Sequence, residues 1–271
     1  MAHMSTLVSE LLAELSTFQA REEQLRRIYR WRNRRPMFYR PHLFSHSKKV
    51  AWLVGTVLPS VRTILKNFDE KRAFALALVH DDAEILTGDY QAGDKANMSR
   101  EQLSVLDKEE REAVQVLAAK FPKIVGGYDY KELLFDILDL TTPEAWVAKY
   151  LDRFDAFGEG LHEIYAGNIG FTQTVHTEFG ETPRFTDLNV SLREKMMKKY
   201  PGLQSLKNSH VFFEPSVFLD WNTIVPTRSP YTQESLEEPV GYLQYDEWKK
   251  VILNSGDSEE IKNLYTQQEF L

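Results

Sequence analysis

The 271-residue chain contains no cysteine. A protein without thiols has no disulfide framework, no thiolate zinc site and no cysteine nucleophile. Long apolar runs are also missing: the longest covers seven residues, Ala73–Val79, whereas a membrane helix needs about 20. The first residues do not show the basic and then apolar pattern of a secretory signal. We therefore expect a cytoplasmic globular protein with no membrane partner.

An excess of basic charge is absent as well. The sequence has 33 basic and 40 acidic side chains, which gives a formal net charge of −7. Proteins that bind duplex nucleic acid usually carry a basic surface, so we expect no such partner here. A few local cations are still enough to hold a small anionic substrate.

Helical periodicity dominates the first two thirds of the chain. Leu7, Leu11 and Leu15 recur at the spacing of one helix face. The same reasoning predicts further helices over residues 45–65, 71–86, 100–120, 130–138 and 143–165. Residues 33–44 and 87–98 are predicted to be loops. Because no alternating pattern indicates a large sheet, the predicted fold class is an all-α helical bundle.

Capping motifs mark three of the predicted helix starts. Ser45 is the predicted N-cap of the helix that follows it. Ser99 and Gln102 have the spacing of a capping box. Thr142 is the predicted N-cap of the last helix, since Pro143 then takes the first helical position.

The character of the sequence changes from about residue 200. Five of the eleven prolines lie beyond this point, in stretches without periodicity apart from an amphipathic segment near residues 242–253. We predict a helical domain over residues 5–170 and a less regular C-terminal extension over residues 171–271 that packs on it or caps it. A lid, an oligomer contact and a wrap around the core remain open roles for this extension.

Residues with metal-binding chemistry interrupt the apolar helices. His46 shares a helix face with core residues, where a single histidine is more often a hydrogen-bonded core residue than a ligand. His80 and Asp81 directly follow the apolar run, at the point where a buried helix meets a polar loop. Asp152 lies on a helix that is apolar nearly all round, so a metal ion or a salt bridge must offset the cost of burying it.

Considered as a set, these four residues favour a metal site. Their nitrogen and oxygen donors suit one six-coordinate Mn²⁺, Co²⁺, Fe²⁺ or Mg²⁺, completed by water, better than a closed structural zinc site. For Asp152 alone, a salt bridge to Lys149 or Arg153 is the simpler explanation.

These motifs resemble the HD phosphohydrolase superfamily, whose metal ligands follow the pattern H…HD…D on separate helices of an all-α domain. The closer resemblance is to the bacterial YfbR-like 5′-deoxynucleotidases, and it covers about residues 20–165. The matching motifs are Arg30-Trp31, His46-Ser47, the decapeptide His80–Asp89 and the segment Asp152–Ala156. The decapeptide is the most specific of them.

The resemblance implies a metal-dependent 5′-nucleotidase that hydrolyses deoxyribonucleoside 5′-monophosphates, a small-molecule nucleotide substrate. It implies that the divalent cation is bound by His46, His80, Asp81 and Asp152. It further implies that Glu84 is the general acid or base and that Arg30 holds the phosphate. Trp31 would exclude a 2′-hydroxyl and Asp89 would accept the 3′-hydroxyl. Family members are usually homodimers, and we expect the same here.

Several features leave other interpretations open. Glu84 also suits an ordinary surface helix, and Gly88-Asp89 also suits a turn that ends a helix. The arginine-rich residues 26–35 are denser in charge than a monophosphate requires. The alternatives are therefore a deoxynucleoside triphosphate phosphohydrolase on the same scaffold and a non-catalytic nucleotide-binding or sensing module.

Overall fold

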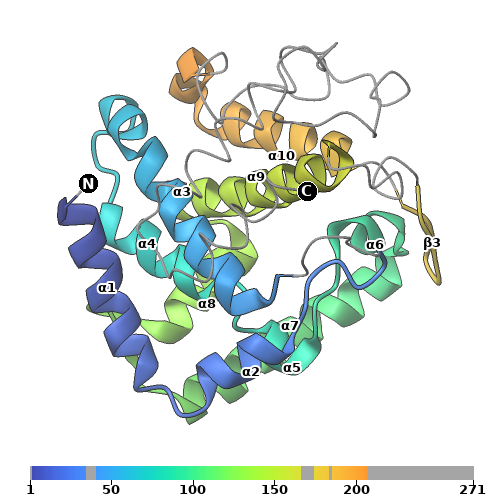
Figure 1. The fold of residues 1–271 in the computed structure, drawn as a ribbon, viewed down its shortest axis with the longest axis horizontal. Coiled ribbons are helices and arrows are strands. Elements are labelled where there is room, and N and C mark those ends of the chain that lie inside the picture. The colour runs from blue at the N-terminus through green and yellow to red at the C-terminus, as the bar shows by residue number, and fades with distance from the viewer. Residues whose placement is uncertain (1, 35–40, 166–173, 183–184, 207–271) are drawn as a thin grey trace. The chain divides into compact units, whose positions relative to one another are not determined.

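The computed structural model describes residues 2–34, 41–165, 174–182 and 185–206 (Figure 1). Its first helices are α1 (Ala2–Ser16), α2 (Arg21–Arg27), α3 (Leu43–Ile64), α4 (Glu70–Val79), α5 (Glu84–Thr87) and α6 (Ala92–Asn97). They are followed by α7 (Arg100–Lys120), α8 (Tyr130–Asp139), α9 (Pro143–Tyr165), α10 (Phe185–Lys199) and the 3-10 helix η2 (Pro201–Leu206). The strands form two short antiparallel hairpins, β1 (Ile124–Val125) with β2 (Tyr128–Asp129) and β3 (His176–Thr177) with β4 (Gly180–Glu181). The predicted all-α class is confirmed.

The chain divides into two compact units. The first consists of Met1–Arg30, Pro41–Gln91 and Met98–Asp152, and the second of Trp31–Arg40, Ala92–Asn97 and Arg153–Leu271. The predicted division into residues 5–170 and 171–271 stays a prediction, and the amphipathic segment near residues 242–253 lies outside the described residues. In the described part of the chain, no helix combines the length and the apolar character that a membrane span requires.

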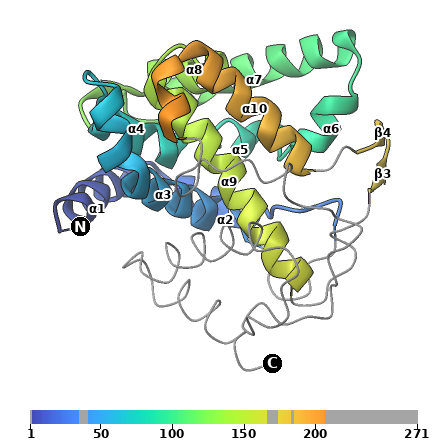
Figure 2. The same cartoon turned by 90° about the horizontal axis from the view of Figure 1, so that it is seen from above.

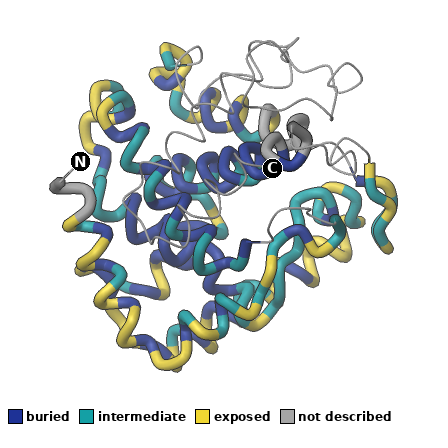
Figure 3. Tube along the Cα trace, in the orientation of Figure 1, coloured by how far each residue is buried: buried dark blue, intermediate teal, exposed yellow. Residues whose placement is uncertain are grey.

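Helix α4 is the centre of the first unit. It contacts α1, α3 and α8, and Figure 2 shows α3 and α4 side by side. Every residue of Ala73–Val79 is buried, which Figure 3 shows in dark blue. A helix that is covered on all sides has no use for a polar face, and this explains why its sequence is an uninterrupted apolar run.

The helix starts confirm two of the three predicted caps. The Ser99 hydroxyl accepts from the Gln102 amide and the Gln102 side chain accepts from the Ser99 amide, as in a capping box. The Thr142 hydroxyl accepts from the Ala145 amide at the start of α9. The third prediction was wrong, because His42, not Ser45, is the N-cap of α3. The imidazole of His42 accepts the Ser45 amide proton at 3.0 Å, as a serine or aspartate would.

The predicted helix over residues 71–86 is also corrected, since α4 ends at Val79 and a tighter turn leads to α5. Side chains donate hydrogen bonds to the carbonyl groups that would accept backbone amide protons if the helix continued. The Ala77 carbonyl accepts from His80 Nδ1 at 2.7 Å, and the Leu78 carbonyl accepts from Arg21 Nη2 at 2.6 Å. The turn is then closed by bonds three residues apart, such as that from the Asp82 amide to the Val79 carbonyl.

The second unit contains a helix that the sequence did not predict. The predicted loop of residues 87–98 includes α6, whose Asp94 is fully buried. Both carboxylate oxygens of Asp94 accept from Asn33 Nδ2 at 3.0 Å, and Gly93 lies so close to Thr182 that a Cβ atom would be 3.0 Å from it. These partners are distant in sequence, so local propensity does not reveal the helix.

Asp136 ties the end of α8 to the start of α9 and to α4. Its carboxylate accepts the amide protons of Thr141 and Thr142 at 3.1 and 3.0 Å, and Arg72 Nη2 at 2.9 Å. Burial alone would raise the pKa of the Asp136 carboxyl, but the hydrogen bonds from the two threonines and Arg72 outweigh it and lower the pKa below 3.8.

We therefore expect Asp136→Asn to lower the free energy of unfolding by about 2 kcal/mol at pH 7. Because the folded carboxyl has a lowered pKa, its contribution is complete above about pH 5 and decreases as the pH falls below about 4. Urea unfolding of both proteins between pH 7 and 3 should show the difference shrinking towards acid pH. Asp107→Asn, at an exposed position on α7, is the control; a difference that grows with acidification would contradict the expectation.

Candidate metal centre

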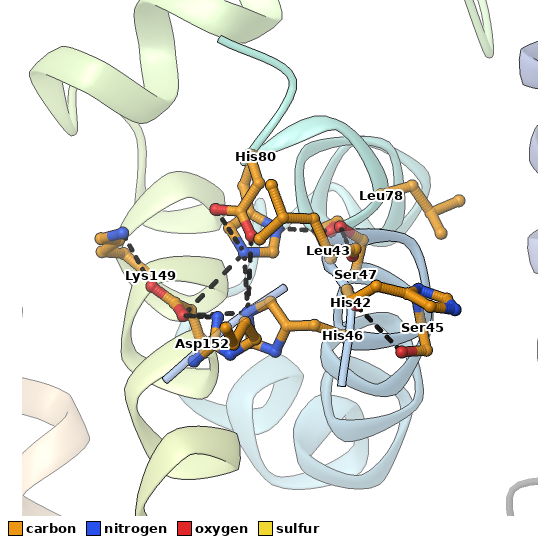
Figure 4. Close-up of polar contacts among 12 residues, drawn as sticks. His42, Leu43, Ser45, His46, Ser47, Leu78, His80, Lys149 and Asp152 are labelled. Carbon is orange, nitrogen blue, oxygen red and sulfur yellow. Dashed lines mark hydrogen bonds and ion pairs between the residues drawn. The ribbon is translucent and has the colours of Figure 1, made fainter. Parts of the chain in front are cut away.

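Three segments of the first unit carry the predicted metal ligands. His46 lies in the first turn of α3 and is fully buried, on the same face as Val50 and Leu53. His80 is the C-cap residue that follows Val79 at the end of α4, and Asp81 comes next in the turn. Asp152 lies on α9, as the last residue of α9 that belongs to this unit. Because α3 and α4 pack against each other, their polar ends meet beside α9 (Figure 4).

The structure brings the four side chains together. The distance from His46 Nε2 to Asp152 Oδ1 is 3.0 Å, and that from His80 Nε2 to His46 Nε2 is 3.2 Å. His80 Nε2 is 3.1 Å from Asp81 Oδ1 and 4.0 Å from Asp152 Oδ1. The donor atoms of His46, His80 and Asp81 all lie within 4.8 Å of one another, as the ligands of one ion do. Figure 4 shows His46, His80 and Asp152 directed at a common point.

The protonation of His80 follows from its hydrogen bond. Its Nδ1 atom faces the carbonyl oxygen of Ala77, which only accepts, so Nδ1 carries the proton. In the neutral imidazole, Nε2 then presents a lone pair to the cluster. Metal-binding histidines are commonly held in this tautomer by a backbone carbonyl.

The chemistry of the donor set fits a divalent cation. Asp81 Oδ2 is buried and accepts no hydrogen bond from the described residues, while it lies 3.7 Å from His46 Nε2. A buried carboxylate oxygen without a proton donor is costly, and a cation among the four groups removes that cost. Two imidazole nitrogens and two carboxylates suit the borderline and hard divalent ions of the first transition row and Mg²⁺.

Both carboxylates are held in the charged form that binds a metal ion. Burial alone would raise the pKa of Asp81, but His80 and His46 outweigh it and lower the pKa well below 3.8. Burial has the same effect on Asp152, where Lys149 and the two histidines keep the pKa well below its ordinary value. Lys149 Nζ is 2.7 Å from Asp152 Oδ2, so the salt bridge considered as the simpler explanation exists beside the contact with His46.

Two further predicted residues lie in the same electrostatic environment. Arg30 Nη1 is 3.7 Å from Asp152 Oδ1, and the Arg30 side chain is only 13% exposed. Asp89 is half-buried, and burial is the main reason why its pKa is raised. Asp81 and Asp152 raise the pKa of Asp89 further, whereas Arg30 and His46 lower it. Arg30 thus lies beside the four-residue cluster, and Asp89 interacts electrostatically with Asp81, His46 and Asp152 of that cluster.

Glu84 and Trp31 occupy different positions. Glu84 is the first residue of α5, one turn after His80, and its Oε2 atom is shielded from solvent. Trp31 belongs to the second unit, where it has a left-handed backbone conformation with φ +59° and donates its indole proton to Glu159 at 2.9 Å. The predicted roles of both residues stay predictions.

One buried group beside the predicted ligands is not among the residues predicted from the sequence. Asp82 is fully buried and accepts hydrogen bonds from Arg21 and Tyr130. The only local signal was a second acidic residue directly after His80-Asp81, and its partners lie 61 and 48 residues away in the chain.

Comparison with known proteins agrees with these motifs. The sequence model of the YfbR-like 5′-deoxynucleotidases matches residues 17–190, a range that includes every predicted site residue. A 5′-deoxynucleotidase from Photorhabdus laumondii is 26% identical over 168 residues, which are 59% of this chain and 80% of that protein. A predicted metal-dependent phosphohydrolase from Magnetospirillum magnetotacticum, known from its crystal structure, aligns with 70% of this chain and 94% of its own at 19% identity and a TM-score of 0.42.

Proposed function

The chain belongs to the YfbR-like 5′-deoxynucleotidase family, and from this membership we propose that it removes the 5′-phosphate from deoxyribonucleoside monophosphates. Membership makes the protein a phosphohydrolase at the level of the family. The convergence of His46, His80, Asp81 and Asp152 in one buried cluster is the observation that supports the metal-dependent reaction.

The same four residues would hold one divalent cation. When bound, the cation supplies Lewis-acid polarisation of a phosphoryl oxygen and neutralises charge on the phosphate. Manganese, cobalt, magnesium and iron all suit the donor set. Lys149 supports the site from outside, because its bond to Asp152 Oδ2 leaves Oδ1 directed at His46.

The other predicted residues act on the substrate. Arg30 would hold the phosphate, and its position beside Asp152 Oδ1 with the side chain mostly buried supports this role, because a guanidinium presents a fork of donors to phosphate oxygens. Hydrolysis joins a water oxygen to phosphorus and breaks the bond to the 5′-oxygen, which then needs a proton. Glu84 is the proposed group that moves this proton. Asp89 would accept a hydrogen bond from the sugar 3′-hydroxyl, and Trp31 would exclude a substrate with a 2′-hydroxyl.

Replacement of Glu84 separates proton transfer from metal binding. We expect Glu84→Gln to lower the rate of phosphate release by about 10²–10⁴-fold, because the amide cannot exchange a proton with the substrate. Metal affinity should stay within about threefold of the wild type, since Glu84 is not among the proposed ligands. Phosphate release under saturating substrate and metal titration of the metal-free protein measure the two quantities. Glu109→Gln, at an exposed position on α7, is the control, and a fully active Glu84→Gln enzyme would remove Glu84 from the mechanism.

A phosphate-release screen tests the proposed substrate. Mono-, di- and triphosphates of ribo- and deoxyribonucleosides are supplied in turn with Mn²⁺, Co²⁺ or Mg²⁺. The proposal expects inorganic phosphate from deoxyribonucleoside monophosphates. Pyrophosphate or tripolyphosphate released from triphosphates would instead establish the triphosphate phosphohydrolase. Tight nucleotide binding without any release would favour the sensing module.

We also propose that the protein acts in the cytoplasm as a homodimer. Its binding partner would be the small-molecule nucleotide substrate, and neither duplex nucleic acid nor a membrane would be a partner. Light scattering after size-exclusion chromatography gives the molar mass in solution. A value near twice 31.5 kDa is expected, and a value near 31.5 kDa would contradict the dimer.

A further inference from the structure

A buried polar network surrounds the residue that follows the proposed ligand Asp81. Arg21 Nε donates to Asp82 Oδ2 at 2.7 Å and Arg21 Nη2 donates to Asp82 Oδ1 at 2.6 Å. The Tyr130 hydroxyl donates to Asp82 Oδ2, also at 2.7 Å. Arg21 is 2% exposed, and Asp82 and Tyr130 are fully buried. We name these three residues the Arg21–Asp82–Tyr130 network.

The network also holds the backbone of the segment that carries two proposed ligands. Arg21 Nη2 donates to the Leu78 carbonyl at 2.6 Å as well as to the Asp82 carboxylate. One guanidinium therefore joins residue 78 to residue 82, and His80 and Asp81 lie between the two points that it holds. Its bond to Leu78 uses a carbonyl that would otherwise belong to a continuing helix.

Stability alone does not account for this arrangement. A buried ion pair is often no more stabilising than well-packed apolar side chains of similar volume, because the cost of removing both charges from water is large. Metal ligands, in contrast, must be held in a defined geometry, and the groups that orient them commonly change metal affinity when they are removed. The bidentate bond and the Tyr130 hydroxyl fix Asp82 at three points, directly beside Asp81.

We propose that the Arg21–Asp82–Tyr130 network positions His80 and Asp81 for metal binding. The three residues do not touch the ion or the substrate, and they act by fixing the turn between α4 and α5. This inference rests on the proposed function, because it presupposes a metal ion at His46, His80, Asp81 and Asp152.

The first test removes a single hydrogen bond. Tyr130→Phe keeps the ring that packs edge-on against Phe18 at 5.2 Å but deletes the bond to Asp82. Tyr128→Phe is the matched control, since it deletes a bond from a tyrosine hydroxyl to the carboxylate of Asp69 at the opposite end of α4. We expect Tyr130→Phe to weaken Co²⁺ binding to the metal-free protein about tenfold and Tyr128→Phe to leave it unchanged. Equal affinities for the two variants would count against the network.

The second test separates positioning from stability. The triple variant Arg21→Met, Asp82→Leu and Tyr130→Phe replaces the network with apolar side chains, so its urea unfolding midpoint should stay close to that of the wild type. We expect its Co²⁺ affinity to fall by about 10- to 100-fold. The visible ligand-field spectrum of the bound cobalt should also change, because it reports the arrangement of the ligands and a merely structural role would not alter it.

The outcomes distinguish this inference from the proposed function. If the wild type takes up no Co²⁺, Mn²⁺ or Mg²⁺, the metal site and the inference both fail. If the wild type binds cobalt and the folded triple variant binds it with the same affinity and spectrum, only the positioning role is overturned. If the triple variant does not fold, the Co²⁺ affinities of Tyr130→Phe and Tyr128→Phe decide whether the network positions the ligands.

Discussion

Asp81→Ala should abolish metal uptake and lower phosphate release by about 10³-fold or more. Asp81 is 5% exposed, its Oδ1 atom is 3.1 Å from His80 Nε2, and its Oδ2 atom has no proton donor among the described residues. Loss of the carboxylate removes one of the four donors and half of the negative charge of the site, and a hard divalent ion, which prefers oxygen ligands, depends most on that charge. A metal ion contributes several kcal/mol to phosphoryl chemistry, and each tenfold change in rate corresponds to about 1.4 kcal/mol. Loss of the ion should therefore lower the rate by about 10³-fold or more.

The measurement combines titration of the metal-free variant with a phosphate-release assay. His80→Ala should behave in the same way as Asp81→Ala, because His80 Nε2 and Asp81 Oδ1 lie 3.1 Å apart and both are proposed ligands of the same ion. Asp107→Ala, which removes an exposed carboxylate on α7, is the control and should keep both properties. Full metal-dependent activity of Asp81→Ala would show that the reaction occurs elsewhere.

Arg21→Met should lower the free energy of unfolding by about 3–5 kcal/mol, because it leaves the buried Asp82 carboxylate without its counter-ion. Tyr130 then remains the donor to Asp82 among the partners described above, and one hydroxyl does not balance a full buried charge. The loss is a large part of the roughly 5–15 kcal/mol that stabilises a typical domain.

An arginine in exposed ion pairs is the control for the buried Arg21. Arg111 bonds to Asp107 and Asp139 on the surface, and pairs of this kind contribute at most about 1 kcal/mol. Urea unfolding of the metal-free Arg21→Met and Arg111→Met proteins compares the two. A loss below about 1 kcal/mol for Arg21→Met would show that the turn reorganises or that water reaches Asp82.

Local sequence signals predicted the helices well where a helix depends on its own residues. Ser99 with Gln102 and Thr142 with Pro143 marked the starts of α7 and α9 because capping bonds join residues that are neighbours in sequence. The apolar run before His80 identified a buried helix without any information on its partners.

Contacts between distant residues account for the errors. Arg21 and His80 take the carbonyls at the end of α4, which is why the predicted helix over residues 71–86 breaks after Val79. Asn33 and Thr182 hold α6 at residues where the local sequence indicates a loop. The N-cap of α3 was missed for a different reason, because His42 is an unusual capping residue and Ser45 a common one.

The candidate site shows the same division. The pattern of His46, His80-Asp81 and Asp152 predicted side chains that the structure does bring together. The Arg21–Asp82–Tyr130 network was beyond prediction, because an arginine, an aspartate and a tyrosine on separate elements have no local spacing to reveal them.

A crystal grown with manganese, with anomalous scattering recorded near the manganese absorption edge, tests the central claim most directly. The account predicts a single strong peak within about 2.3 Å of donor atoms from His46, His80, Asp81 and Asp152. It would be contradicted by a map in which these groups bind only one another and any manganese lies at other residues.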